Sequence, residues 1–118
     1  MELASKALCA AYAVVSAAAL AGTWSHNLAF LATPDHGGVA GFLRGTMANH
    51  AAASISLDLA FLGVALMVWM VVEARRLGIR FVWVYVTLSF LVAISVMFPL
   101  FLIARERRLA EGAGRAAG

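Results

Sequence analysis

Three long apolar blocks restrict the fold of this chain more than any other feature. They run from Ala7 to about Thr23, from Ala51 to Val72 and from Phe81 to Ala104. The third block carries no charge, and the second carries only Asp58. A helix needs about 20 apolar residues to cross a bilayer, and lipid permits only helices and closed barrels as spanning structures. The sequence therefore predicts an all-α, polytopic membrane protein.

Composition supports this fold class and excludes others. The chain is 64% hydrophobic and 13% charged, whereas soluble domains are about half apolar and a quarter charged. The net charge of +3 does not indicate nucleic-acid binding, because the arginines stand just outside the apolar blocks, where they anchor helix ends. The single cysteine, Cys9, cannot form a disulfide within one chain.

The blocks predict three transmembrane helices in an up-down-up bundle. We expect one domain over residues 1–110, with spans at about 5–30, 50–76 and 80–107, followed by a disordered tail over residues 111–118. Asn49 is expected to cap the second helix, and Gly78 is expected to end it. The residues after Gly38, among them Phe42 and Arg44, predict a short helix in the interface plane.

The first apolar block has a second interpretation, as a cleaved signal peptide. Lys6 precedes the block and Ala19-Leu20-Ala21 resembles a cleavage site, as in a signal peptide.

The orientation of the bundle in the membrane is nearly balanced by charge. An up-down-up bundle divides the cations almost equally between the two membrane faces, so the positive-inside rule hardly distinguishes the two orientations. We expect a cytoplasmic N-terminus. One side would carry Lys6, Arg75, Arg76 and Arg80, and the other Arg44, Arg105, Arg107, Arg108 and Arg115.

Asp58 is the most informative polar residue, because a charge at the centre of a span costs about 2.5–3.5 kcal/mol. Pro99 has no N–H, so the carbonyl of Ser95 loses its helical partner at a similar depth. We therefore expect Asp58 to face the other two helices and to form a hydrogen bond with Ser95, Thr23 or His26. A purely structural role, holding the helices together, is the alternative.

Other polar side chains near the same membrane face extend this prediction to a binding pocket, in which Asp58 is the only catalytic candidate. The predicted pocket consists of His26, Asn27, Asn49, His50, Ser54, Asp58 and Ser95. We interpret the two histidines as interface residues, and we expect no metal and no cofactor. Glu73 is expected to form a helix-end ion pair of little energetic value with Arg76 or Arg80.

Several motifs resemble a bacterial family of small three-helix membrane proteins known only as a domain of unknown function (2834). They are Trp24-Ser25-His26-Asn27, then Asn49, Ser54 and Asp58, the run from Trp69 to Gly78, the run Phe98-Pro99-Leu100-Phe101-Leu102, and Arg105-Glu106. The resemblance extends over nearly the whole chain to about Leu109. It implies a multi-pass protein of the bacterial inner membrane with three spans, and it implies no activity.

Three functional hypotheses remain open. The one that we favour is a non-enzymatic accessory or assembly subunit that contacts the lipid bilayer and either a membrane-protein partner or further copies of itself in a homo-oligomer. The second is an oligomeric proton- or cation-coupled transporter in which Asp58 binds the ion, because three helices are too few to enclose a pathway. The third is a membrane enzyme that acts on a polyprenoid-like substrate with Asp58 as general acid, which requires an apolar cavity beside Asp58.

Overall fold

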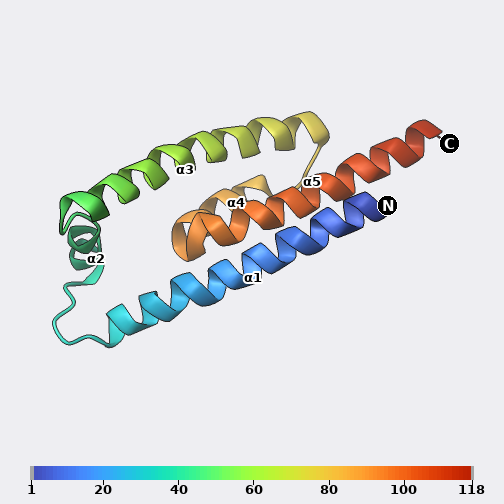
Figure 1. Cartoon of the computed structure of the whole chain (residues 1–118). Helices are drawn as coiled ribbons and strands as arrows, with labels where there is room; N and C mark the ends of the chain where they lie inside the picture. Colours follow the sequence, from blue (N-terminus) through green and yellow to red (C-terminus); the bar gives the residue numbers. More distant parts are fainter. Residues whose placement is uncertain (1, 118) are drawn as a thin grey trace.

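The structure, a computed structural model, describes residues 2–117, and side chains up to residue 113. Within that range the chain is helical apart from short loops and contains no strand, so the all-α prediction is confirmed. Figure 1 shows the order of the elements. They are α1 (Leu3–Ala32), α2 (Gly38–Thr46), α3 (His50–Leu77), α4 (Val82–Leu88), the π-helix η1 (Ser89–Ala93) and α5 (Ile94–Ala117).

Three helical stretches are long and apolar enough to cross a membrane, as the three blocks predicted. They are Leu3–Ala32, His50–Leu77 and Val82–Ala113. Helix α2 forms where a short helix was expected. Helix α5 continues to Ala117, through the segment that was expected to be a disordered tail.

The predicted boundaries of the second helix are confirmed in atomic detail. The Asn49 side chain accepts a hydrogen bond from the backbone N–H of Ala52 at 2.8 Å, which caps the start of α3. Gly78 adopts the left-handed conformation, with φ of 70°, and its N–H donates to the carbonyl of Ala74. This left-handed residue ends α3.

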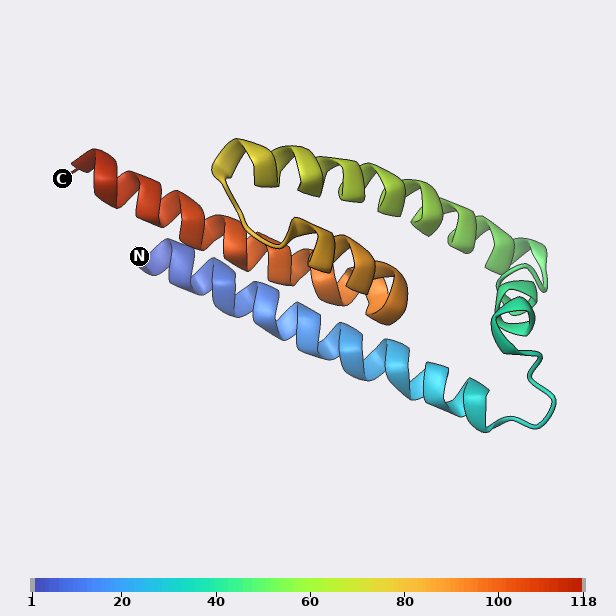
Figure 2. The ribbon, with the colours of Figure 1, turned by 180° about the vertical axis from the view of Figure 1, so that it is seen from behind.

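The third apolar stretch is a helical hairpin. Figures 1 and 2 both show α4 running back along α3 and α5 returning in the opposite direction after η1. In one straight helix, the 16 residues between Tyr85 and Phe101 would separate them by about 24 Å. Their ring centroids lie 5.6 Å apart. The hairpin is therefore established by a side-chain contact as well as by the path of the backbone.

The hairpin gives α5 the same direction as α3. Ile94 packs against Gly63, and Arg105 pairs with Glu73 further along both helices, so the residue numbers rise together. The expected up-down-up arrangement is not confirmed. In Figure 1 the C-terminal end of α5 lies beside the N-terminal end of α1, whereas three successive spans would place these ends on opposite faces.

Two hydrogen bonds join α1 to the hairpin. The hydroxyl of Ser16, which is 4% exposed, donates to the carbonyl of Val96 at 2.8 Å. The indole N–H of Trp24 donates to the carbonyl of Val92, within η1, at 2.9 Å. A π-turn disturbs the regular i→i+4 ladder, and side-chain donors can bond the carbonyls there. These bonds hold the hairpin against α1, which is antiparallel to α5.

Replacing Ser16 by alanine should lower the free energy of unfolding by about 0.6 kcal/mol, and by no more than about 1.7 kcal/mol, which is the range for hydrogen bonds between membrane helices. The loss should appear as a shift of the unfolding midpoint when protein in mild micelles is titrated with a denaturing detergent. Ser25→Ala is the control, because the Ser25 hydroxyl is exposed and bonds only Gly22 in its own helix. Equal shifts for both variants would contradict the proposed interhelical contribution.

Candidate functional site

Asp58 lies on the outer face of α3. Its side chain is exposed, and it forms no hydrogen bond or ion pair within the part of the chain whose side chains are described. Five residues separate it from the buried Gly63, which places the two residues about 140° apart around the helix. The expected hydrogen bond to Ser95, Thr23 or His26 is therefore wrong for this chain taken alone. The physical reason is that α3 turns its small residue, Gly63, toward Ile94.

The structure does not gather the other predicted pocket residues around Asp58. Asn49 serves as the helix cap described above, and Thr23 donates to its own helix at Ala19. Asn27 is half-buried and lines a groove of about 710 Å³ between α1, α2 and η1, whose other lining residues include Phe42 and Phe90. The remaining pocket candidates are exposed, namely His26, His50, Ser54 and Ser95.

The expected hydrogen bond to the Ser95 carbonyl, which loses its helical partner at Pro99, is not found among the described side chains. The carbonyl that receives a side chain is that of Val96, and the donor is Ser16 rather than Asp58. Sequence analysis did not single out Ser16, which lies among small apolar residues of α1. The sequence feature that could have identified Ser16 is a hydroxyl group in the middle of an otherwise apolar span.

A buried ion pair lies at the opposite end of α3. The Glu73 carboxylate, whose side chain is 5% exposed, accepts from Arg105 Nε at 3.0 Å. Arg76 approaches the same carboxylate only to 3.8 Å, and its own side chain is 71% exposed. The guanidinium of Arg105 also lies 5.6 Å from the ring centre of Trp69. The expected pairing of Glu73 with Arg76 is present as the longer contact, but the principal partner is Arg105, which the hairpin brings beside it.

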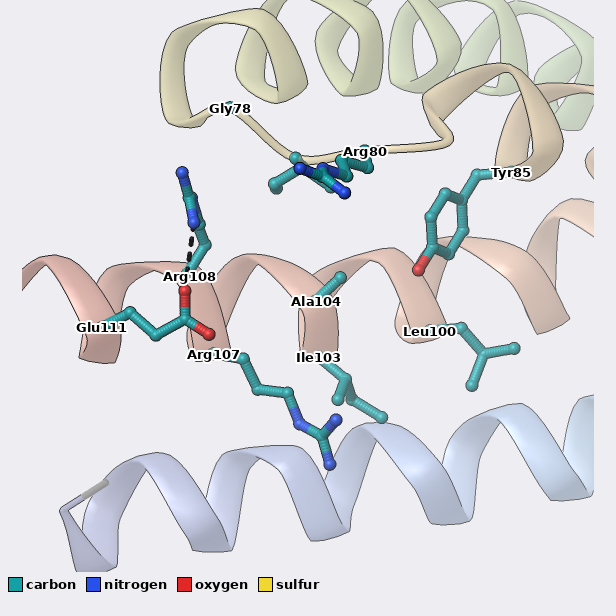
Figure 3. Close-up of a pocket in the computed structure, with 10 residues that line it drawn as sticks. Gly78, Arg80, Tyr85, Leu100, Ile103, Ala104, Arg107, Arg108 and Glu111 are labelled. Atoms are coloured by element: carbon teal, nitrogen blue, oxygen red, sulfur yellow. Dashed lines mark hydrogen bonds and ion pairs between the residues drawn. The ribbon is translucent and has the colours of Figure 1, made fainter.

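The same end of the molecule holds a polar cavity of about 570 Å³ between the α3–α4 loop and α5. Arg108 is fixed on its edge, because its Nε donates to the Leu77 carbonyl at 2.7 Å and its Nη1 pairs with Glu111 at 3.1 Å. Figure 3 shows Arg80 on the α3–α4 loop, the Tyr85 hydroxyl directed toward α5, and Arg107 extending from α5 toward α1. The apolar lining residues are Ile79, Leu100, Ile103 and Ala104.

The hairpin also concentrates positive charge at this end. Of the eight lysine and arginine residues whose side chains are described, seven lie near the N-terminus of α1, around the end of α3 or in the later part of α5. Arg44, in α2, lies at the other end of the molecule. The even division of cations expected for three successive spans is therefore not found. The seven are Lys6, Arg75, Arg76, Arg80, Arg105, Arg107 and Arg108.

Fold and charge together define the class of this molecule as a multi-pass, all-helical membrane protein. Within residues 2–117 no three side chains of His, Cys, Asp or Glu are grouped so as to hold a metal ion. A family model described as "Protein of unknown function DUF2834" matches residues 11–107, and the chain belongs to this family. Comparisons with curated proteins and with solved structures found no match.

Proposed function

We propose that this chain is a non-enzymatic accessory or assembly subunit of a bacterial inner membrane, which docks a second membrane protein along the outer face of α3. The observation that carries the proposal is the position of Asp58. It is an exposed carboxyl, without a hydrogen-bond partner among the described side chains, in a helix long and apolar enough to span a membrane. Such a group facing lipid is costly, and intramembrane acids usually pair with other polar groups.

The surroundings of Asp58 indicate what the partner must supply. Ser54 lies one helical turn before it, and exposed apolar side chains flank it at Ile55, Phe61 and Leu62. A transmembrane segment that packs here would cover apolar surface and could donate a hydrogen bond to the carboxyl. The partner is therefore a helix with a hydrogen-bond donor within the bilayer at the depth of Asp58.

A second copy of this chain fits the same face less well. Two copies related by a two-fold axis would place their Asp58 carboxyls at the same depth and facing each other, and like charges at close range oppose ionisation of both. The transporter and enzyme hypotheses receive less support, because Asp58 lines neither of the two cavities described above. A heteromeric contact best accounts for a lone outward carboxyl.

Site-specific photo-crosslinking in native membranes tests the proposal. A photoreactive residue at Leu62, one turn after Asp58, should give one discrete protein adduct of a mass different from twice the chain. The same probe at Val64 should give no such adduct. Val64 is similarly exposed, but it lies about 120° from Asp58 around the axis of α3. Asp58→Asn should keep most of the Leu62 adduct, because an amide still accepts a hydrogen bond. Asp58→Leu should reduce its yield by about tenfold or more.

Three results would contradict the proposal. Equal adducts from the Leu62 and Val64 probes would mean that contact is not confined to this face. An adduct that survives Asp58→Leu at full yield would mean that the carboxyl does not hold the partner. An adduct of twice the mass of this chain would replace the heteromeric contact with a homo-oligomer.

A further inference from the structure

We propose that the cavity between the α3–α4 loop and α5 binds the phosphate headgroup of an anionic membrane lipid, whose acyl chain lies along the apolar part of the cavity. This site is at the opposite end of α3 from Asp58, and it does not depend on the docking proposal. Three arginines and a tyrosine line a space of about 570 Å³, which also has an apolar lining.

The charges of the cavity favour an anion. Arg80 and Arg107 are exposed, and neither forms an ion pair or a side-chain hydrogen bond within the described side chains. Arg108 is partly neutralised by Glu111, the only carboxylate in the lining. The lining therefore carries three positive charges against one negative charge. Arginine binds phosphate oxygens through paired N–H donors, and two of these guanidinium groups lack a partner within the chain.

The depth of the cavity favours a lipid as the source of the phosphate. Its arginines lie at the end of the molecule where the other interfacial cations gather, which is the level of lipid headgroups. Leu100, Ile103 and Ala104 precede Arg107 and Arg108 on α5, so the apolar part of the lining extends from the charged part toward the bilayer core. An amphiphile matches this polarity, and basic pockets between helices bind anionic lipid headgroups.

Gly78 contributes to the shape of this site. A Cβ built at Gly78 would lie 3.1 Å from Arg108 Nη2, and the residue also needs its positive φ of 70°. The bond from Arg108 Nε to the Leu77 carbonyl fixes the loop against α5. The loop that carries Arg80 is thereby held at the cavity edge without a ligand.

The test is lipid binding by the full chain in mild detergent, measured by native mass spectrometry during titration with phosphatidylglycerol. Arg80→Gln combined with Arg107→Gln should weaken binding by about 30-fold, because each cation near an anionic headgroup contributes about fivefold. Arg75→Gln combined with Arg76→Gln removes the same charge at the same end but outside the cavity, and it should weaken binding by less than about threefold. Tyr85→Phe should cause an intermediate loss without changing charge.

Four outcomes would overturn the site as proposed. Equal weakening by the two double variants would mean general attraction to a basic surface. Phosphatidylcholine bound as tightly as phosphatidylglycerol would exclude recognition of net negative charge. Inorganic phosphate that displaces phosphatidylglycerol at equal concentration would assign the site to a soluble phosphate instead. Unchanged binding by the variant with both Arg80→Gln and Arg107→Gln would mean that the lipid does not bind in this cavity. Circular dichroism of each variant would verify that the protein is folded.

Discussion

Replacing Arg105 by methionine should destabilise the protein by about 3 kcal/mol, at the lower end of the range for breaking a buried ion pair. The substitution leaves the Glu73 carboxylate buried, with only the distant contact to Arg76 at 3.8 Å. It also removes the cation from the face of Trp69, a contact of about 0.5–1 kcal/mol. Unfolding in a denaturing detergent, followed through tryptophan fluorescence, measures the loss.

Two further variants separate the ion pair from simple loss of charge. Arg76→Met should cost less than about 1 kcal/mol, because its side chain is 71% exposed and its contact with Glu73 is long. Glu73→Met combined with Arg105→Met should regain most of the stability lost in Arg105→Met, because no buried charge is left unpaired. If the double variant were as unstable as the sum of its single variants, Glu73 and Arg105 would not be coupled, and the hairpin contact would be contradicted.

The sequence was sufficient to predict the helices and their ends. Apolar length predicts a spanning helix directly, and the first two stretches formed as single helices, whereas the third formed the hairpin. The ends of α3 followed from local chemistry, because an asparagine side chain accepts at a helix start and glycine tolerates a positive φ at a helix end. Each of these features depends on only a few neighbouring residues.

The direction of the third stretch could not be predicted from the same information. Hydropathy measures how apolar a segment is and does not depend on whether the segment folds back. The reversal at η1 is established by contacts between distant residues, such as Tyr85 with Phe101 and Arg105 with Glu73.

The expected site failed for a related reason. Depth along each helix was estimated from the helix ends, but the rotation of α3 depends on which of its faces packs best. Gly63, Met70 and Ala74 are buried against the hairpin, and Asp58 projects from the other side of the helix. The cost of a charge in lipid was a sound reason to expect a partner for Asp58, and we now look for that partner outside the chain.

The fold-back also changes the predicted orientation. Three successive spans divide the cations almost evenly, whereas the hairpin places seven of the eight lysine and arginine residues with described side chains near one end. The positive-inside rule then favours a cytoplasmic location for this end. Because the N-terminal end of α1 and the C-terminal end of α5 both lie there, we expect both ends of the chain in the cytoplasm.

Topology mapping tests the helical hairpin most directly. Reporters would be fused in separate experiments to the N-terminus, to the C-terminus and into the α1–α2 loop at Asp35, with green fluorescent protein reporting the cytoplasm and alkaline phosphatase reporting the periplasm. The hairpin predicts fluorescence and no phosphatase activity at both termini, and phosphatase activity without fluorescence at Asp35. A C-terminal fusion with active phosphatase, beside an N-terminal fusion that fluoresces, would mean three successive spans and would contradict the fold-back of residues 82–113.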